Sequence, residues 1–224
     1  MSTDLLQYYA QRAREYEEIY ARPERQADLD RVRPWLRGEL HGHRVLEVAC
    51  GTGYWTAWLA PVAEGIVATD AGAEVLGAAR QKSYPPERVR FAVADAYDLG
   101  AVSGEFSAAF AGFFWSHVPR ARLPEFLWSL HRRLGPGARV VFLDNRFVAG
   151  SSTPIARRDD AGDTYQRRWL GDGTEHKVLK NFWSPAELRA ALSADARGLR
   201  IVEFEYYWGA SYETKGERPA TSCT

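Results

Sequence analysis

Residues 45–55 read Val45-Leu46-Glu47-Val48-Ala49-Cys50-Gly51-Thr52-Gly53-Tyr54-Trp55, and this stretch decides the fold. An apolar strand runs directly into a glycine turn, and the turn opens a segment with helical spacing. In a parallel sheet such a turn lies at the carboxyl end of the first strand, where ligands bind. Because glycine has no Cβ, the backbone there can approach a ligand closely. Glu47 adds a carboxylate at the same edge of the sheet.

Several cofactor classes use a glycine turn of this kind, and the neighbouring residues discriminate between them. A Walker phosphate loop needs Gly-Lys-Ser/Thr, which is absent from this turn. A dinucleotide loop needs a further glycine where Thr56 stands, and Glu47 would repel the pyrophosphate. S-adenosylmethionine carries an ammonium and a sulfonium group and no phosphate. The turn therefore favours S-adenosylmethionine as the cofactor.

Outward from this turn, predicted strands alternate with predicted helices. Strands are expected at 44–48, 65–69, 89–94, 106–111 and 139–143, and helices at 24–36, 54–59, 73–81 and 123–134. Strands separated by helices at this spacing form right-handed crossover units and a parallel sheet. The predicted fold class is therefore α/β and Rossmann-like, with a mostly parallel sheet flanked by helices.

Acidic residues follow the first three predicted strands. Glu47, Asp70 and Asp95 are spaced by about one strand–helix–strand repeat, so their side chains are expected to meet at one crevice. An acid after the second strand can bind the ribose hydroxyls of a nucleoside. An acid after the third can accept from an adenine amino group, and Ala96 can offer its backbone N–H to the ring.

These segments together resemble the class I S-adenosylmethionine-dependent methyltransferases. The resemblance rests on residues 47–53, 69–71, 94–96 and 106–118, with Ala49 and Ser107 as departures from the glycine and aspartate of many members. It implies a seven-stranded sheet with the last strand antiparallel, and methyl transfer that leaves S-adenosylhomocysteine. The implied cofactor-binding residues are Tyr16, Glu47, Ala49, Gly51, Gly53, Tyr54, Trp55, Asp70, Ala71, Asp95, Ala96, Ala111 and Phe113. The motifs are also similar to those of bacterial secondary-metabolism methyltransferases, including azapteridine N-methyltransferases.

The remaining segments are interpreted as parts of one methyltransferase domain over residues 1–224. Residues 1–40 are predicted to form an N-terminal helical lid, 41–148 the cofactor-binding core, 149–183 a cap with a β-hairpin, and 184–215 a closing helix and strands. Aromatic residues at helical spacing over 4–20, including Tyr16 and Tyr20, either pack on the body or cover the ligand. Ser184 and Glu187 predict a capping box at the start of the closing helix.

Methyl transfer from a sulfonium is an in-line displacement, so the protein mainly aligns the acceptor and excludes water. His117 follows the fourth predicted strand and is the candidate general base, although a histidine held by backbone carbonyls at a turn would look the same. The predicted substrate contacts are Tyr8, Tyr9, Trp115, Asp144, Asn145, Tyr165 and Trp183. Replacing Trp115 or Trp183 is expected to harm acceptor binding more than cofactor binding.

The composition limits the chemical classes to which the methyl acceptor can belong. The 224 residues carry 29 basic and 29 acidic side chains, which argues against nucleic acid and anionic membranes as partners. The Asn/Asp-Pro-Pro-Tyr and Pro-Cys motifs of nucleobase methyltransferases are absent. With 8 Trp, 11 Tyr and 10 Phe, the chain favours a small aromatic or heteroaromatic acceptor, methylated on nitrogen or oxygen. An NAD(P)-linked reductase and a non-catalytic binding protein that retains the fold are the alternatives.

Compartment and metal content are also bounded by the sequence. The N-terminus lacks a signal-peptide pattern and no apolar run reaches about 18 residues, so a cytoplasmic protein is expected. The two cysteines, Cys50 and Cys223, form neither a disulfide framework nor a zinc cluster, so no metal is expected.

Overall fold

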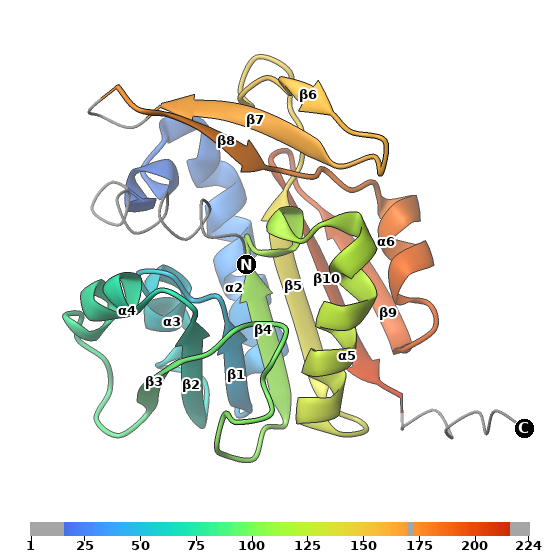
Figure 1. Ribbon diagram of the computed structural model, residues 1–224. Coiled ribbons are helices and arrows are strands. Elements are labelled where there is room, and N and C mark those ends of the chain that lie inside the picture. The colour runs from blue at the N-terminus through green and yellow to red at the C-terminus, as the bar shows by residue number, and fades with distance from the viewer. Residues whose placement is uncertain (1–15, 170–172, 216–224) are drawn as a thin grey trace, which may run out of the picture.

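A seven-stranded sheet runs through the middle of the molecule (Figure 1). The computed structural model describes residues 16–169 and 173–215. The strand order is β3 (Val89–Val93), β2 (Gly65–Asp70), β1 (Arg44–Val48), β4 (Ala108–Gly112), β5 (Arg139–Asn145), β10 (Tyr207–Thr214) and β9 (Ala196–Glu203). Only β10 runs against its neighbours, pairing antiparallel with both β5 and β9. The predicted mostly parallel sheet with an antiparallel last strand is confirmed.

Helices cover both faces of this sheet. On one face, α5 (Leu123–Leu134) and α6 (Pro185–Leu192) bury Phe126 and Leu188 against the strands, and Figure 1 shows both helices in front of the sheet. On the other face, α2 (Gln26–Leu40) and α3 (Tyr54–Leu59) bury Val32 and Leu59. Helix α4 (Ala73–Arg80) packs on β2 and β3. Burial on both faces explains why the inner strands are almost continuously apolar.

Some predicted boundaries differ from the observed ones. The helix expected at 24–36 begins at Gln26, after the 3-10 turn η2 (Pro23–Arg25), and continues to Leu40. It continues because Leu36 and Leu40 extend the same buried stripe. The strand expected from 106 begins at Ala108, since the Ser107 hydroxyl instead accepts from the backbone of Arg44. Most of the predicted helix over 4–20 lies outside the described residues, and Tyr16–Tyr20 forms the 3-10 turn η1.

A second, three-stranded sheet lies across the end of the main sheet (Figure 1). We call it the cap sheet; it consists of β6 (Arg157–Arg158), β7 (Thr164–Trp169) and β8 (Glu175–Leu179). The predicted hairpin corresponds to β7 and β8, with β6 as an added edge strand. After β8 the chain returns to α6, where the capping box of Ser184 and Glu187 is present as predicted. The cap sheet therefore stands over the carboxyl ends of the parallel strands, where ligands bind in such folds.

Within residues 16–169 and 173–215, no helix combines the length and the hydrophobicity needed to span a membrane.

Candidate active site

The glycine turn after β1 has a left-handed backbone at several positions. The φ angles are 55° at Ala49, 56° at Gly51 and 77° at Gly53. A Cβ added to Gly51 would meet no atom within 4 Å, so the space above this residue is open. A Cβ on Gly53 would lie 2.5 Å from the Tyr84 hydroxyl and 3.2 Å from the Ala79 Cβ, and the left-handed φ of this residue also favours glycine. Ala49 holds the same backbone region without being glycine, a strained arrangement of the kind that occurs at binding sites.

Asp70 fixes the shape of the turn from the neighbouring strand. Its Oδ2 atom accepts from the backbone N–H of Gly51 over 2.9 Å, and its Oδ1 atom accepts from that of Gly72 over 2.9 Å. Burial raises the pKa of the Asp70 carboxyl, while these backbone donors lower it. The carboxylate predicted to bind ribose therefore also holds the glycine turn.

Glu47 is a buried acid at the base of the same turn. The side chain lies in the interior with 2 % exposure, and its Oε2 atom has no hydrogen-bond partner among the described residues. Burial raises the pKa of Glu47 to about 8. A buried carboxylate oxygen without a donor is costly unless a ligand supplies one. An ammonium group would satisfy this atom, so the site fits the positively charged amino-acid end of S-adenosylmethionine.

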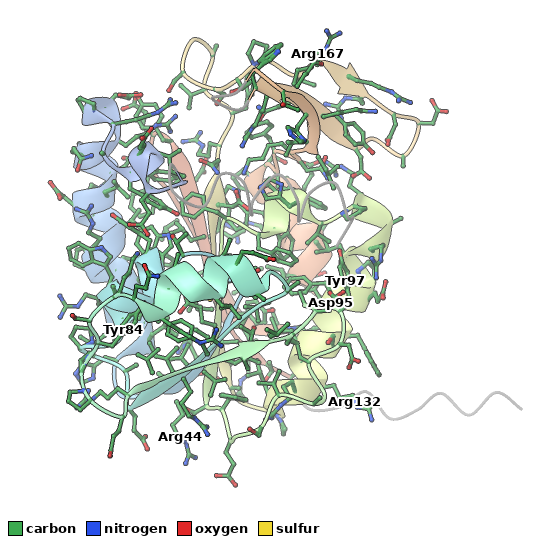
Figure 2. All side chains as sticks on the ribbon, turned by 60° about the vertical axis from the view of Figure 1, so that its left-hand side comes forward. Arg44, Tyr84, Asp95, Tyr97, Arg132 and Arg167 are labelled. Carbon is green, nitrogen blue, oxygen red and sulfur yellow. The ribbon has the colours of Figure 1, made fainter. Side chains whose placement is uncertain are left out.

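A cleft joins most of the predicted cofactor residues on β1 and α3. It is lined by Tyr20, Glu47, Ala49, Cys50, Gly51, Thr52, Tyr54, Trp55, Phe110 and Gly112. Asp95 lies beyond this lining, at the end of β3, where its Oδ1 atom accepts from the backbone N–H of Tyr97 (Figure 2). Since β3, β2 and β1 are neighbours, Asp95 shares the sheet edge with Asp70 and Glu47. Ala96 and Ala111 belong to the buried core.

The turn η1 covers the cofactor cleft. The ring of Tyr20 stacks on Tyr54 with centroids 3.8 Å apart, and its hydroxyl accepts from Trp55 Nε1 over 3.1 Å. Glu17 accepts from the Thr52 hydroxyl over 2.7 Å and also from Lys82. Sequence reasoning anticipated an aromatic lid and missed the polar contacts of Glu17, because they join η1 to residues far along the chain.

A larger cavity of about 410 Å³ lies between the cap sheet and the carboxyl ends of β4 and β5. Its lining comprises Ile19, Arg22, Arg25, Phe113, His117, Asn145, Ser151, Ser152, Thr153, Gln166, Arg167, Arg168, Trp169, Lys180, Phe182 and Tyr207. Phe113 belongs to this lining and also packs against Trp55 of the cofactor cleft, with ring centroids 6.0 Å apart. Its φ of 59° is unusual for a bulky residue. The two spaces therefore adjoin at a strained residue.

His117 lies in the 3-10 turn η3 (Trp115–His117) and lines the larger cavity. Its Nδ1 atom is 2.7 Å from the carbonyl oxygen of Leu179, which can only accept, so Nδ1 carries the proton. Burial, with help from the charges of Lys180 and Arg168, holds the pKa of His117 well below its usual value. The ring is therefore neutral near neutral pH, with its lone pair on Nε2. The histidine is held by a carbonyl and also borders the cavity.

A buried polar cluster supports the floor of the cavity. Asp144 is fully buried and accepts from the backbone N–H and hydroxyl of Ser116 over 2.8 and 2.9 Å. Lys180 Nζ lies 2.6 Å from the Ser116 hydroxyl and 3.2 Å from Asp144 Oδ1. Of the two polar residues predicted at the end of β5, Asn145 lines the cavity. Asp144 does not line it, but it contacts Ser116 and the lining residue Lys180.

The aromatic residues predicted to contact the acceptor lie elsewhere. Trp115 is fully buried in the core, packed edge-on against Phe142, Trp183 and Trp208, because η3 turns its ring toward the sheet. Trp183 packs against that core under the Arg120 guanidinium, and Tyr165 donates to Asp159. Neither of them, nor Trp115, lines the cavity. Tyr8 and Tyr9 lie outside the described residues, as does the side chain of Tyr16.

The residues that sequence reasoning missed are mostly cationic. Arg167-Arg168 resembles a solvated pair, and Arg25 lies before a helix without any motif. Strand alternation predicts that Gln166 and Arg168 share a face, but it would not have found Arg167 and Trp169, which line the cavity as well. Gln166 and Arg168 line the cavity, as does Lys180 just after β8. Figure 2 shows Arg167 on the cap sheet, far from Arg44 and Arg132 at the opposite end of the molecule.

The chain is similar in sequence to known methyltransferases. A family model described as a methyltransferase domain matches residues 45–137. The chain is 34% identical over 119 residues to a demethylmenaquinone methyltransferase of Clavibacter sepedonicus, covering 52% of this chain and 46% of the relative. It is 32% identical over 160 residues to a ubiquinone biosynthesis O-methyltransferase of Xanthomonas oryzae pv. oryzae, covering 70% and 63%. The chain thus spans about half to two thirds of the length of these curated relatives.

Solved structures match over nearly the whole chain. A complex of a protein named DhpI with SAH has a TM-score of 0.75 and 29% identity, covering 96% of this chain and 97% of that one. A second complex, DhpI-SAM-HEP, has the same TM-score and 28% identity, covering 98% and 100%. Both alignments therefore span nearly all of each chain.

Proposed function

The chain belongs to the class I S-adenosylmethionine-dependent methyltransferases, and on that premise we propose that it methylates a nitrogen or oxygen of a small molecule held under the cap sheet. One observation carries the proposal: the cofactor cleft with its unpartnered Glu47 oxygen adjoins the larger cavity at Phe113. A volume of about 410 Å³ is in the range of small-molecule sites. We propose further that the chain is one domain, with residues 149–183 as its cap. Of the lid predicted over residues 1–40, η1 supplies Tyr20 to the cofactor cleft, whereas α2 packs on the main sheet.

When bound, S-adenosylmethionine supplies an activated methyl group, whose bond to sulfur breaks as the bond to the acceptor forms, leaving a neutral thioether. The residues proposed to hold it are Glu47 at the ammonium, Asp70 at the ribose, and Asp95 with Ala96 at the adenine. Tyr20 and Tyr54 exclude water from the cleft by their stacked rings. Most of the contribution of the chain is therefore alignment of the two reactants and exclusion of solvent.

His117 is proposed as the base for an acceptor that must lose a proton. The neutral ring has its lone pair on Nε2, and the bond from Nδ1 to Leu179 fixes the orientation of the ring. Transfer to a hydroxyl would then form the carbon–oxygen bond, while the hydroxyl proton passes to Nε2. An acceptor oxygen that is already ionised needs no base, and the ring would then only position it.

We also propose that the acceptor is aromatic or heteroaromatic. The residues predicted to contact its ring do not line the cavity; they are Trp115, Trp183 and Tyr165. The aromatic lining that supports a planar acceptor is instead Phe113, Trp169, Phe182 and Tyr207.

The test is direct. Calorimetric titration of the full chain with S-adenosylhomocysteine should give saturable binding, and methyl-labelled S-adenosylmethionine should label small acceptors from a mixed panel. Absence of S-adenosylhomocysteine binding by a folded chain would overturn the proposal. Binding without labelling of any acceptor would favour the non-catalytic alternative.

A further inference from the structure

The cavity under the cap sheet is lined by cationic side chains. They are Arg22, Arg25, Arg167, Arg168 and Lys180, and none of the described lining residues is Asp or Glu. The whole chain has a formal net charge of zero, so this concentration of positive charge is local. A concave surface of one charge sign raises the local concentration of the opposite ion. Glu24, Glu175 and Asp144 pair with Arg22, Arg167 and Lys180 from outside the lining, so the cations face the cavity while these carboxylates do not line it.

Arg25 is buried and held in place at this lining. It is 8 % exposed, its guanidinium lies 3.9 Å from the Tyr206 ring centroid, and its Nη2 atom donates to the Ser151 hydroxyl over 2.9 Å. The carboxylate of Glu24 is 4.0 Å away, beyond hydrogen-bond distance. The closest contacts of this buried guanidinium are therefore a hydroxyl and an aromatic ring, neither of which neutralises its charge. An anionic ligand would do so.

Arg168 and Lys180 also line the cavity. Arg168 donates to the neutral side-chain oxygen of Gln166 over 2.8 Å. Lys180 is 4 % exposed and has one carboxylate contact, with Asp144. Arg168, Lys180 and His117 all line this cavity, and the positive charge of Arg168 lowers the pKa of both Lys180 and His117. Arg25 and Lys180 are buried and Arg168 is half-buried, so a small anion in this cavity would be attracted by all three side chains.

We propose that the methyl acceptor is a small anion, bound through carboxylate or phosphoryl oxygens by Arg25, Arg168 and Lys180. This inference rests on the proposed function, since it concerns the acceptor of that reaction. Guanidinium groups match the paired oxygens of these anions, and the charge-assisted hydrogen bonds are stronger than neutral ones. The hydroxyl of Ser151, already oriented by Arg25, lies on the same wall.

The carboxylate of the cofactor itself is the other anion that these cations could bind. The experiment removes it by measuring anion binding to the full chain saturated with S-adenosylhomocysteine, at constant ionic strength. Inorganic phosphate, acetate and phenol are titrated separately by calorimetry, as phosphoryl, carboxylate and neutral aromatic probes. The variant Arg168→Gln keeps a polar, hydrogen-bonding side chain while removing its charge. Arg157→Gln is the matched control, because Arg157 is exposed on β6 of the same cap sheet and does not line the cavity.

We expect phosphate or acetate to bind the wild-type complex more tightly than phenol, and the tighter of the two identifies the oxyanion. Arg168→Gln should weaken that binding by about tenfold, as expected for one charge-assisted hydrogen bond. Arg157→Gln should leave it unchanged, and both variants should bind S-adenosylhomocysteine within about twofold of wild type.

The inference is overturned if phenol binds at least as tightly as both anions, or if Arg168→Gln binds the anion as wild type does. Those outcomes leave the proposed methyl transfer intact, because they are measured on a chain that has already bound S-adenosylhomocysteine. Failure to bind S-adenosylhomocysteine at all counts against the proposed function instead.

Discussion

The backbone N–H of Gly51 donates to the carboxylate of Asp70 over 2.9 Å, so an acid at the end of β2 fixes the glycine turn at the end of β1. The two residues come from strands paired in parallel register, in which Val48 lies opposite Thr69. Asp70 also accepts from Gly72, the N-cap residue directly before α4. One carboxylate thus ties together the two strand ends that flank the proposed ribose site.

Replacing Asp70 with alanine should weaken S-adenosylhomocysteine binding by at least about tenfold, because the turn loses its anchor and the ribose loses its acceptor. Calorimetric titration and the thermal shift on ligand addition measure the effect. Asp30→Ala is the control, since Asp30 is exposed on α2 and pairs only with Arg33 among the described residues. Equal affinity of Asp70→Ala and wild type would remove Asp70 from the cofactor site.

Glu47 should release a proton when the cofactor product binds. Its pKa of about 8 in the ligand-free chain leaves the carboxyl largely protonated at about pH 7. An ammonium group at Oε2 favours the ionised form and lowers that pKa. Titration with S-adenosylhomocysteine in buffers of different ionisation enthalpy should show net proton release for wild type and less for Glu47→Gln. Identical proton release by the two proteins would contradict the assignment.

The same shift predicts how the stability of the ligand-free chain varies with pH. The pKa of Glu47 is raised from 4.5 to about 8 on folding, so the native state binds more protons than the unfolded state between these values. The contribution of Glu47 to stability is therefore complete below about pH 4.5 and is lost as pH rises through about 8. Glu47→Gln should flatten this decline in urea unfolding curves measured across that range. A decline as steep as that of wild type would assign it to other groups, such as Asp70, whose pKa is also raised.

The cofactor half of the site was predictable because it is local in sequence. Glu47, Gly51 and Asp70 each end a strand or form a turn, and the order of parallel strands brings them together once the fold class is known. The acceptor half depends on contacts that no spacing encodes. Arg25 meets Ser151, and Lys180 meets Ser116, across long stretches of chain. Their positions follow from how the cap sheet docks, so the composition gave no indication of the cationic residues that line the cavity beside the aromatic ones.

The buried Lys180 is expected to be a major stability determinant. Lys180→Met leaves Asp144 buried without its cation, which costs about 3–5 kcal/mol. Asp144→Asn in the Lys180→Met background should recover part of that loss, with a coupling energy of about 1–3 kcal/mol. Urea unfolding of the four proteins gives both numbers. The control is Lys177→Met, an exposed change on β8, whose free energy of unfolding should stay within about 1 kcal/mol of wild type. Additive losses of stability at positions 144 and 180 would show that the pair is not coupled.

Because Trp115 lies in the core, replacing it should lower the stability of the fold and should not act specifically on acceptor binding. Trp115→Ala removes a fully buried ring from the core and should cost about 3–5 kcal/mol. Trp128→Ala is the matched control, because Trp128 is 60% exposed on α5 and should cost about 0.5 kcal/mol or less. Thermal and urea unfolding distinguish the two. A Trp115→Ala protein as stable as wild type would place the ring outside the core.

His117→Ala tests whether the chain removes a proton during methyl transfer. If His117 is the base, turnover should fall by about 10²–10⁴-fold, with little change in the affinity for S-adenosylhomocysteine. Because burial holds the pKa of His117 well below 6.5, the wild-type rate should be flat through neutral pH and fall only in more acidic solution. Protonating this buried ring also destabilises the fold as pH falls, so circular dichroism at each pH separates unfolding from loss of catalysis. His41→Ala, at an exposed site beyond α2, should behave as wild type. A loss of less than about tenfold at every pH would mean that alignment of an already ionised acceptor is sufficient, which is the result expected if the acceptor oxygen itself carries the negative charge.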